Sequence, residues 1–480
     1  MTKIKKQILT VVVLALVLAL LGTAYYFMTK EDDGPVEEKI EYGAFGETMK
    51  NGRPIIVDKV ENEDMNSITV HNAYDEYTLI HKKSGAYKLE GLEDYEVNQE
   101  LLAKLRVNAL YLLATGYVEN AELDNLEQYG INVDNPAVWF EVLYNKEQDS
   151  YKILVGDKTP DGTGYYAMLE GRDALYILDT GLESSILLPR RAYVMPKPVD
   201  SVEETHVYTL KDFTLYKGGK KFISIEKASG GLTYGNNSTH FITYPAYNYA
   251  TNLTNFEILI KALKDLNGTE TLYYGEQVTD SLLRELGFFD AEGNDVSDYS
   301  FTYSYPAFSE QVYVMKNGDA GEYIVYSLKE NIIVRANEAS LSFLDWDMLL
   351  WLSAEIYMLD IEDIASVEFE YEDKTASYNI LGTGADLSVT GNNIPVDTTK
   401  FKELYKSIMY VIVTAYADDA DYGKEQLKMT VTTEKGEVLE YCFYTHTATN
   451  SYYTLNGFGE FYVSAEKVLA LRDSAFALVK

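Results

Sequence analysis

The sequence predicts an α+β fold in which an N-terminal transmembrane helix precedes three repeated units, each an antiparallel sheet covered by a helix. Three observations predict it: an uncharged apolar run near the N-terminus, three helix-period segments with the same internal spacing, and strand-like stretches in similar order around each of them. Strands joined by short turns pair antiparallel, and an amphipathic helix buries its apolar stripe against such a sheet.

The apolar run near the N-terminus predicts a membrane anchor. Residues 8–28 carry no charge and consist mostly of Val, Leu, Ala and aromatic residues. At about 1.5 Å rise per residue, a helix of this length spans a hydrocarbon core about 30 Å thick. Three lysines precede the run, so we expect residues 1–7 in the cytoplasm and the bulk of the chain outside it. A cleaved signal peptide is the alternative, but the run ends in Ala24-Tyr25-Tyr26-Phe27, where aromatics replace a small-residue cleavage site.

The amino-acid composition of the chain limits the kinds of partner that it can bind. The 75 acidic residues against 41 basic ones give a formal net charge of −34. Such a surface repels nucleic acid, so we expect no nucleic-acid partner. Cys442 is the one cysteine, so core burial rather than an intrachain disulfide must stabilise the fold. The 42 tyrosines suit half-buried strands, where the ring packs and the hydroxyl reaches water.

Three helix-period segments share one spacing. Each begins after a residue that caps helices well, at Asn98, Asn252 and Asp397. Positions four, seven, eleven and fourteen after each cap are apolar: Leu102, Leu105, Ala109 and Leu112; Phe256, Leu259, Leu263 and Leu266; Phe401, Leu404, Ile408 and Val411. A stripe at helical period, in register with the cap three times, predicts an internal repeat.

The surrounding segments complete the predicted unit. Two strand-like stretches precede each helix, and four strand-like stretches and a closing helical segment follow it, which gives the order β-β-α-β-β-β-β-α. The closing segments are expected at residues 182–188, 339–352 and 465–478. The predicted domains are a cytoplasmic tail at 1–7, the anchor at 8–28, a tether at 29–66, and repeat units at 67–202, 203–363 and 364–480.

The first unit resembles a known family. It carries LEQYGI at residues 126–131, ILVGDKTP at 153–160, the pair Tyr165-Tyr166 and LYIL at 175–178. These segments resemble the bacterial domain-of-unknown-function family 4340, whose members are usually membrane-anchored and often encoded beside gliding-motility-type ABC transporter subunits. The resemblance implies an accessory role outside the cytoplasm, with ABC transporter subunits or another membrane or surface protein as partner. It carries no catalytic residues over, and the motifs also suit plain turns.

Motifs for chemistry are missing from the sequence. None of the five histidines lies two, three or four residues from another, so no zinc spacing is present. The carboxylates at Asp418, Asp419 and Asp421 lack the glycine and terminal glutamate of an EF-hand, so a solvated loop is expected there and a weak calcium site is the alternative. No nucleophile elbow or phosphate-binding loop occurs. We therefore predict no cofactor, no metal and no enzyme activity.

One aromatic segment is a candidate contact surface. Tyr234, Phe241, Tyr244 and Tyr247 lie in a stretch rich in Asn and Thr ahead of the second helix. Exposed aromatic rings of this kind stack on sugars or on a protein partner, although a loop packed on its own sheet is the alternative.

These observations predict a membrane-anchored, extracytoplasmic scaffold or accessory protein that binds a partner beside an ABC transport complex. A cell-surface glycan or cell-wall binding protein is the first alternative. A hydrolase is the second, because paired carboxylates cannot be recognised from sequence alone.

Overall fold

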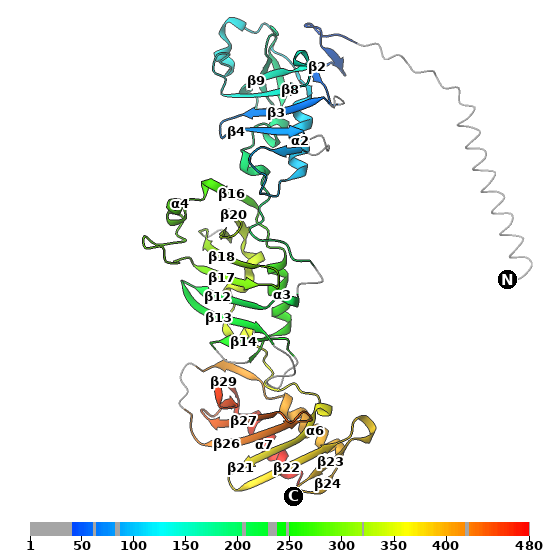
Figure 1. Cartoon of the computed structure of the whole chain (residues 1–480), viewed down its shortest axis with the longest axis vertical. Helices are drawn as coiled ribbons and strands as arrows, with labels where there is room; N and C mark the ends of the chain where they lie inside the picture. The colour runs from blue at the N-terminus through cyan, green and yellow to red at the C-terminus, as the bar shows by residue number, and fades with distance from the viewer. Residues whose placement is uncertain are drawn as a thin grey trace, which may run out of the picture. The chain divides into compact units, whose positions relative to one another are not determined.

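The computed structural model describes residues 41–60, 64–81, 87–203, 208–228, 238–245, 249–318, 321–417 and 422–479. Within these ranges the chain is mostly β-sheet and forms four antiparallel sheets (Figure 1). The predicted α+β class was wrong. The three large sheets contain eight, nine and nine strands, where the sequence predicted six each. The closing segment predicted at 182–188 is a short 3-10 helix, and the one predicted at 339–352 is a 3-10 helix followed by a four-residue α-helix.

The described residues contain no counterpart of the predicted membrane helix. In the ranges that the structure covers, every helix is too short or too polar to cross a bilayer. The predicted tail at residues 1–7, the anchor at 8–28 and the first part of the tether lie outside the described residues.

The first compact unit comprises residues 1–91 and 99–189. A small sheet of order β1-β2-β6 contains β1 (Thr48–Lys50), β2 (Arg53–Asp58) and β6 (Tyr111–Leu113). The large sheet has the order β5-β4-β3-β8-β9-β10-β11-β7. Its strands are β3 (Met65–His71), β4 (Glu76–His81), β5 (Tyr87–Leu89), β7 (Gly116–Tyr117), β8 (Val138–Tyr144), β9 (Tyr151–Lys158), β10 (Gly164–Leu169) and β11 (Tyr176–Asp179). The helices are α2 (Gln99–Leu110), η1 (Leu123–Tyr129), η2 (Glu147–Asp149) and η3 (Thr180–Ser184).

The second compact unit comprises residues 92–98 and 190–480 and holds two large sheets. The sheet nearer the N-terminus has the order β15-β14-β13-β12-β17-β18-β19-β20-β16. Its strands are β12 (Asp212–Lys217), β13 (Lys220–Lys227), β14 (His240–Tyr244), β15 (Tyr249–Ala250), β16 (Glu270–Tyr274), β17 (Tyr299–Ser304), β18 (Ser309–Lys316), β19 (Glu322–Ser327) and β20 (Ile332–Asn337). Its helices are η4 (Arg190–Tyr193), α3 (Leu253–Lys264), η6 (Gly275–Gln277), α4 (Asp280–Glu285), η7 (Glu338–Asp345) and α5 (Met348–Trp351).

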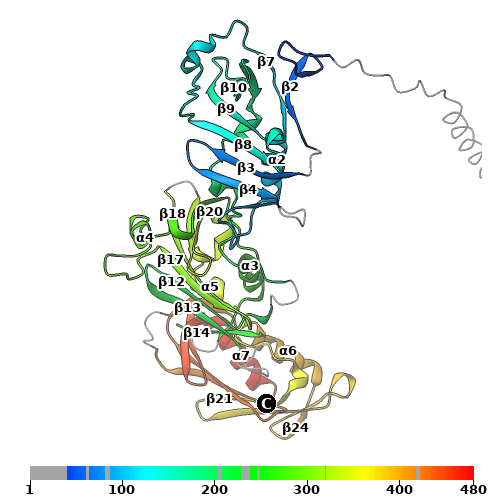
Figure 2. The same ribbon diagram turned by 45° about the horizontal axis from the view of Figure 1, so that its top comes forward.

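The last sheet has the order β24-β23-β22-β21-β26-β27-β28-β29-β25. Its strands are β21 (Ile364–Tyr371), β22 (Lys374–Leu381), β23 (Ser388–Gly391), β24 (Ile394–Val396), β25 (Val413–Tyr416), β26 (Glu425–Thr433), β27 (Val438–Thr445), β28 (Asn450–Leu455) and β29 (Phe458–Ser464). The helices are η8 (Ile361–Asp363), η9 (Gly384–Asp386), α6 (Thr398–Met409) and α7 (Ala465–Ala477). Helices α6 and α7 contact each other, and α7 covers one face of the sheet (Figure 2).

The three large sheets share one strand order. In each, two or three strands extend outward from one side of the first strand, and four consecutive strands extend from its other side. A short strand from the segment after the main helix then pairs at the far edge, as β7, β16 and β25 do. All twelve apolar positions predicted from the three caps are buried. The predicted unit boundaries at 67–202, 203–363 and 364–480 stay predictions.

Two links in the second unit repeat the same contact. The backbone N–H of Asn98 donates to the carbonyl of Tyr193 at 2.8 Å, and that of Asn252 donates to the carbonyl of Trp351 at 2.9 Å. In both cases the residue before a main helix is therefore hydrogen-bonded to the end of a closing segment or to the residues just after it. Because these bonds satisfy backbone groups at the start of each helix, they fix where the connection runs.

The helix caps are testable. The Asp397 carboxylate accepts from the backbone N–H of Lys400 at 2.9 Å at the start of α6. Asp397→Ala is therefore expected to lower the free energy of unfolding by about 1 kcal/mol, measured by urea denaturation. Asp373→Ala, at an exposed turn residue of the same sheet, should change it by less than about 0.5 kcal/mol. Equal losses in the two variants would contradict the capping role.

Candidate functional site

The sequence-predicted contact residues do not gather at one site in the described part of the chain. Tyr234 and Tyr247 lie outside the described residues. Phe241 is buried in β14 at 4% exposure, so it supports the strand from within and its ring is not offered to a ligand. Tyr244, at the end of β14, is 41% exposed, and Lys221 Nζ lies 5.0 Å from its ring centroid. A sugar or partner contact at this segment stays a prediction. The predicted solvated loop at Asp418, Asp419 and Asp421 also lies outside the described residues.

A different aromatic surface lies on the last sheet. Tyr444 on β27 is opposite Tyr452 on β28, and Tyr452 is opposite Tyr462 on β29. Tyr422, just before β26, stacks on Tyr452 with ring centroids 4.8 Å apart and an interplanar angle of 7°. His446 stacks on Tyr462 at 4.3 Å and 16°. We call these five residues the tyrosine ladder.

Strand alternation places the ladder on the face opposite α7. Tyr441 and Phe443 alternate with Tyr444 along β27 and are fully buried. Leu439, two residues before Tyr441 on β27, points to the same face as Tyr441 and is paired with Val431 on β26. Val431 is in turn paired with Val367 on β21, and Val367 with Tyr378 on β22, so these side chains share one face of the sheet. The hydroxyl of Tyr378 donates to the carbonyl of Ala475 on α7, so this is the face that α7 covers. Since successive side chains of a strand point to opposite faces, the ladder points away from α7. Tyr422 is 44% exposed.

Charged groups share the face of the ladder. Lys428 on β26 donates to Glu440 on β27 at 3.1 Å and to Glu370 on β21 at 3.2 Å. The hydrogen bonds to Glu440 and Glu370 raise the pKa of Lys428 above its usual value. With two carboxylates for one ammonium, this part of the face is acidic and favours a partner of positive charge.

The ladder offers packing and hydrogen bonding rather than reactive chemistry. Burial raises the pKa of Tyr444 and of Tyr452 to about 12, so both phenols stay neutral at physiological pH. Burial likewise raises the pKa of the Cys442 thiol, which lies between Glu440 and Tyr444 on this strand. A thiol that resists ionisation is a poor nucleophile. Neutral phenol rings with hydroxyls at their edge are typical of a binding surface.

The ladder could not be recognised in the sequence, because its members come from three strands and from loops beside them. The available signal was the alternation in β27 to β29 together with the hairpin turns between them. Asn456 and Gly457, both with positive φ, form the turn that sets the register of β28 against β29.

The family-like motifs of the first unit are structural. Gly130 ends η1 with a φ of +73°, and a Cβ there would lie 2.4 Å from Cγ of Asp157. At Gly156 a Cβ would lie 2.1 Å from the carbonyl oxygen of Tyr129. The YG and GD pairs are therefore in direct backbone contact, which leaves no room for larger residues.

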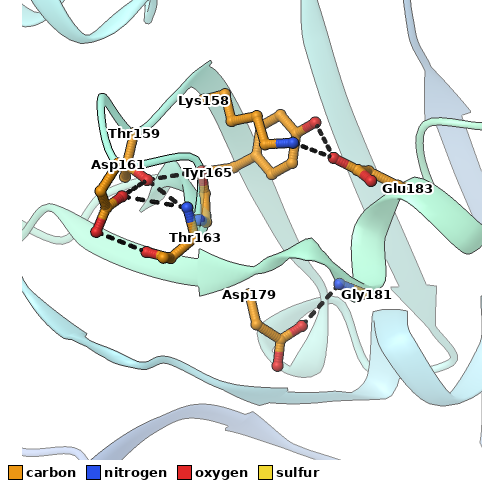
Figure 3. A network of polar contacts seen from close by, with 9 residues as sticks. Lys158, Thr159, Asp161, Thr163, Tyr165, Asp179, Gly181 and Glu183 are labelled. Atoms are coloured by element: carbon orange, nitrogen blue, oxygen red, sulfur yellow. Dashed lines mark hydrogen bonds and ion pairs between the residues drawn. The ribbon is translucent and has the colours of Figure 1, made fainter.

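The turn after the GD pair is held by its own side chains (Figure 3). Asp161 accepts from Thr159 Oγ1 at 2.6 Å and from the N–H and Oγ1 of Thr163 at 3.1 and 2.9 Å. Beside it, Glu183 Oε1 accepts from Lys158 Nζ at 2.7 Å and from the Tyr165 hydroxyl at 2.8 Å. The hydrogen bond from Lys158 lowers the pKa of Glu183. These contacts satisfy one another and indicate a braced turn between β9 and β10.

Comparison with known proteins gives one result for the chain. The family model described as Domain of unknown function (DUF4340) matches residues 88–288. No curated protein and no solved structure matches the chain significantly. The match contains the motifs at residues 126–131 and 153–160 and confirms the family that they predicted. Over residues 88–288, this chain is similar to the family described as the domain of unknown function DUF4340.

Proposed function

We propose that this chain is a non-enzymatic accessory protein that works outside the cytoplasm and binds a protein partner of an ABC transport complex through the tyrosine ladder. The observation that carries the proposal is the stacked, partly exposed row of rings on an open sheet face. The family match supports an accessory role, because the resemblance to this family is what implied that role in the sequence.

The ladder has the properties of a protein-binding surface. Tyrosine is enriched at interface hot spots because its ring buries a large area while its side chain loses little conformational freedom. Here the strands hold the rings in place before binding, so little ordering remains to oppose association. The acidic pairs around Lys428 favour a partner with a basic surface.

Tyr422→Ala is the direct test. Detergent extracts containing the full chain and transporter subunits should yield co-purified subunits with the unaltered chain. Loss of the 44% exposed Tyr422 ring, which also uncovers Tyr452, should weaken the complex by about tenfold or more. The measurement is the fraction of transporter subunit retained at several salt concentrations.

Tyr410→Ala is the matched control. Tyr410 is 63% exposed at the end of α6, away from the ladder strands, and its loss should leave the complex unchanged. Recovery of the chain alone in repeated purifications, or equal retention by Tyr422→Ala and the unaltered chain, would overturn the proposal.

A glycan ligand is the second candidate function. An exposed tyrosine ring such as that of Tyr422, which is 44% exposed, also suits the flat apolar face of a sugar. A pull-down on isolated cell wall separates the two functions. Retention that is lost in Tyr422→Ala would favour glycan binding, and passage of the unaltered chain through the cell-wall fraction would exclude it.

A further inference from the structure

Three carboxylates meet around one lysine in the second compact unit. Asp200 lies in the segment after η4, Glu310 on β18 and Glu330 in the turn between β19 and β20, and each offers an oxygen within 4.8 Å of the others. Lys329 Nζ lies 2.5 Å from Asp200, 2.9 Å from Glu310 and 3.5 Å from Glu330. One positively charged ammonium group thus faces three carboxylates at this cluster.

A cavity of about 330 Å³ adjoins this group, and its wall is also acidic. Asp200 and Glu330 line it together with Asp94 and Glu96. The lysine in its lining, Lys197, is paired with Glu96 at 2.6 Å. Within the described residues, the cluster and the cavity wall therefore hold five carboxylates and two lysines, which leaves an excess of negative charge facing an open space.

A buried oxygen in the cluster has no hydrogen-bond partner. The Glu310 side chain is fully buried, its Oε1 accepts from Lys329, and its Oε2 lacks a partner among the described residues. Tyr303, directly opposite Glu310 on β17, is 1% exposed, and its hydroxyl also lacks a described partner. Buried polar atoms are nearly always paired with protein, water or an ion.

We propose that Asp200, Glu310 and Glu330 form a binding site for Ca²⁺ at this cavity, and that Lys329 occupies the position of the ion when none is bound. The donors are oxygens, without the histidine or cysteine that zinc prefers. Two oxygens that share one Ca²⁺ at about 2.3–2.6 Å can lie up to about 5 Å apart, so three oxygens within 4.8 Å of one another need at most a small approach to hold one ion. Mg²⁺, at about 2.0–2.1 Å, allows only about 4 Å.

Lys329 can give way to such an ion. Its side chain is 39% exposed, so the ammonium can swing into solvent. Its ammonium is held by Asp200 at 2.5 Å and by Glu310 at 2.9 Å. The carboxylates therefore already hold a cation. A divalent ion in its place would neutralise one further charge and would have the cavity open for water ligands.

Calcium titration of the purified full chain tests the proposal. Isothermal titration calorimetry with CaCl₂ after EDTA treatment should show one saturable site with a dissociation constant on the order of 10⁻⁴–10⁻³ M, as in extracellular calcium modules. Asp200→Asn and Glu310→Gln should each weaken binding at least tenfold. Lys329→Met should tighten it about tenfold, because the competing ammonium is gone.

Asp373→Asn is the matched control, because it removes an exposed carboxylate elsewhere in the same unit and should leave the titration unchanged. Asp200 is exposed, so its variant is expected to fold even if Glu310→Gln does not. The absence of calcium heat at millimolar concentration would overturn the proposal. So would equal binding by Asp200→Asn, or weaker binding by Lys329→Met. This test needs no transporter partner, so its outcome is independent of the proposed function.

Discussion

Trp351→Ala is expected to lower the free energy of unfolding of the second compact unit by about 4 kcal/mol. Trp351 is 3% exposed and stacks on Phe213 of β12 with ring centroids 5.7 Å apart. Its ring also packs edge-on against the ring of Trp346, with the ring centroids 5.0 Å apart. Removing the indole leaves a cavity among aromatic rings held by separate elements, and these cannot collapse to fill it. Urea denaturation followed by tryptophan fluorescence measures the loss.

Two further variants give this prediction its controls. Trp351→Phe keeps a ring and should cost only about 2 kcal/mol, since Trp351 Nε1 has no hydrogen-bond partner among the described residues and none is lost. Tyr410→Ala, at a 63% exposed position, should change stability by less than about 0.5 kcal/mol. A loss below about 1 kcal/mol for Trp351→Ala would show that its packing does not stabilise the unit.

Glu47→Ala is expected to destabilise the first compact unit by about 3 kcal/mol. The Glu47 side chain is fully buried and accepts hydrogen bonds from the Tyr117 hydroxyl at 2.9 Å, from the backbone N–H of Phe45 at 3.1 Å and from the Tyr176 hydroxyl. Arg172 lies 3.7 Å away. Removing the carboxylate leaves two hydroxyls and a backbone N–H without their acceptor and Arg172 without its counter-ion, and desolvated donors without a partner are costly. Hydrogen exchange of β10 and β11 amides measures the effect in this unit.

The same carboxylate gives a pH dependence of known sign. Burial opposes its ionisation, but the hydrogen bonds from Tyr176 and Tyr117 outweigh burial and hold the pKa of Glu47 below its ordinary value. A folded-state pKa below the unfolded one means that the unfolded chain binds more protons. The stabilisation is therefore complete above the ordinary carboxyl pKa of about 4.5 and is lost as the pH falls through the lower, folded-state value.

Glu47→Gln isolates this effect from the other acidic residues. The stability difference between the unaltered chain and Glu47→Gln, measured by urea denaturation, should be largest near pH 7 and should shrink towards pH 3. A difference that is constant over this range, or that grows as the pH falls, would contradict the assignment.

The main helices and their buried positions could be predicted from sequence. A capping residue followed by apolar residues at every third or fourth position predicts a helix with one buried and one solvent-exposed face, whatever surrounds it. Phe256, Leu259 and Leu263 on α3 are buried as their spacing predicted, and the side chain of Asn252 caps that helix by accepting from the N–H of Asn255 at 3.1 Å.

The fold class could not be predicted in this way. Edge strands such as β7 (Gly116–Tyr117) and β15 (Tyr249–Ala250) have two residues each, too few for an alternating pattern. They are strands only because a neighbouring strand offers its free backbone groups. Counting them raises the sheets to eight or nine strands and makes the chain mostly β.

The candidate sites depend on contacts between distant residues. In the tyrosine ladder, Tyr422 and Tyr462 are 40 positions apart, and their neighbourhood follows from the register of three strands. In the carboxylate cluster, Asp200 and Glu310 are 110 positions apart. No local pattern joins such residues, because strand pairing depends on the whole sheet.

The sequence by itself therefore determined what depends on near neighbours: three helices, their apolar stripes, the braced turns of the family motifs and the similarity to the family. Only the tertiary structure decided which strands pair, which faces stay open and which charges share a cavity. The physical reason is that helix and turn bonds close within a few residues, whereas sheets and sites are closed by bonds between residues far apart in the chain.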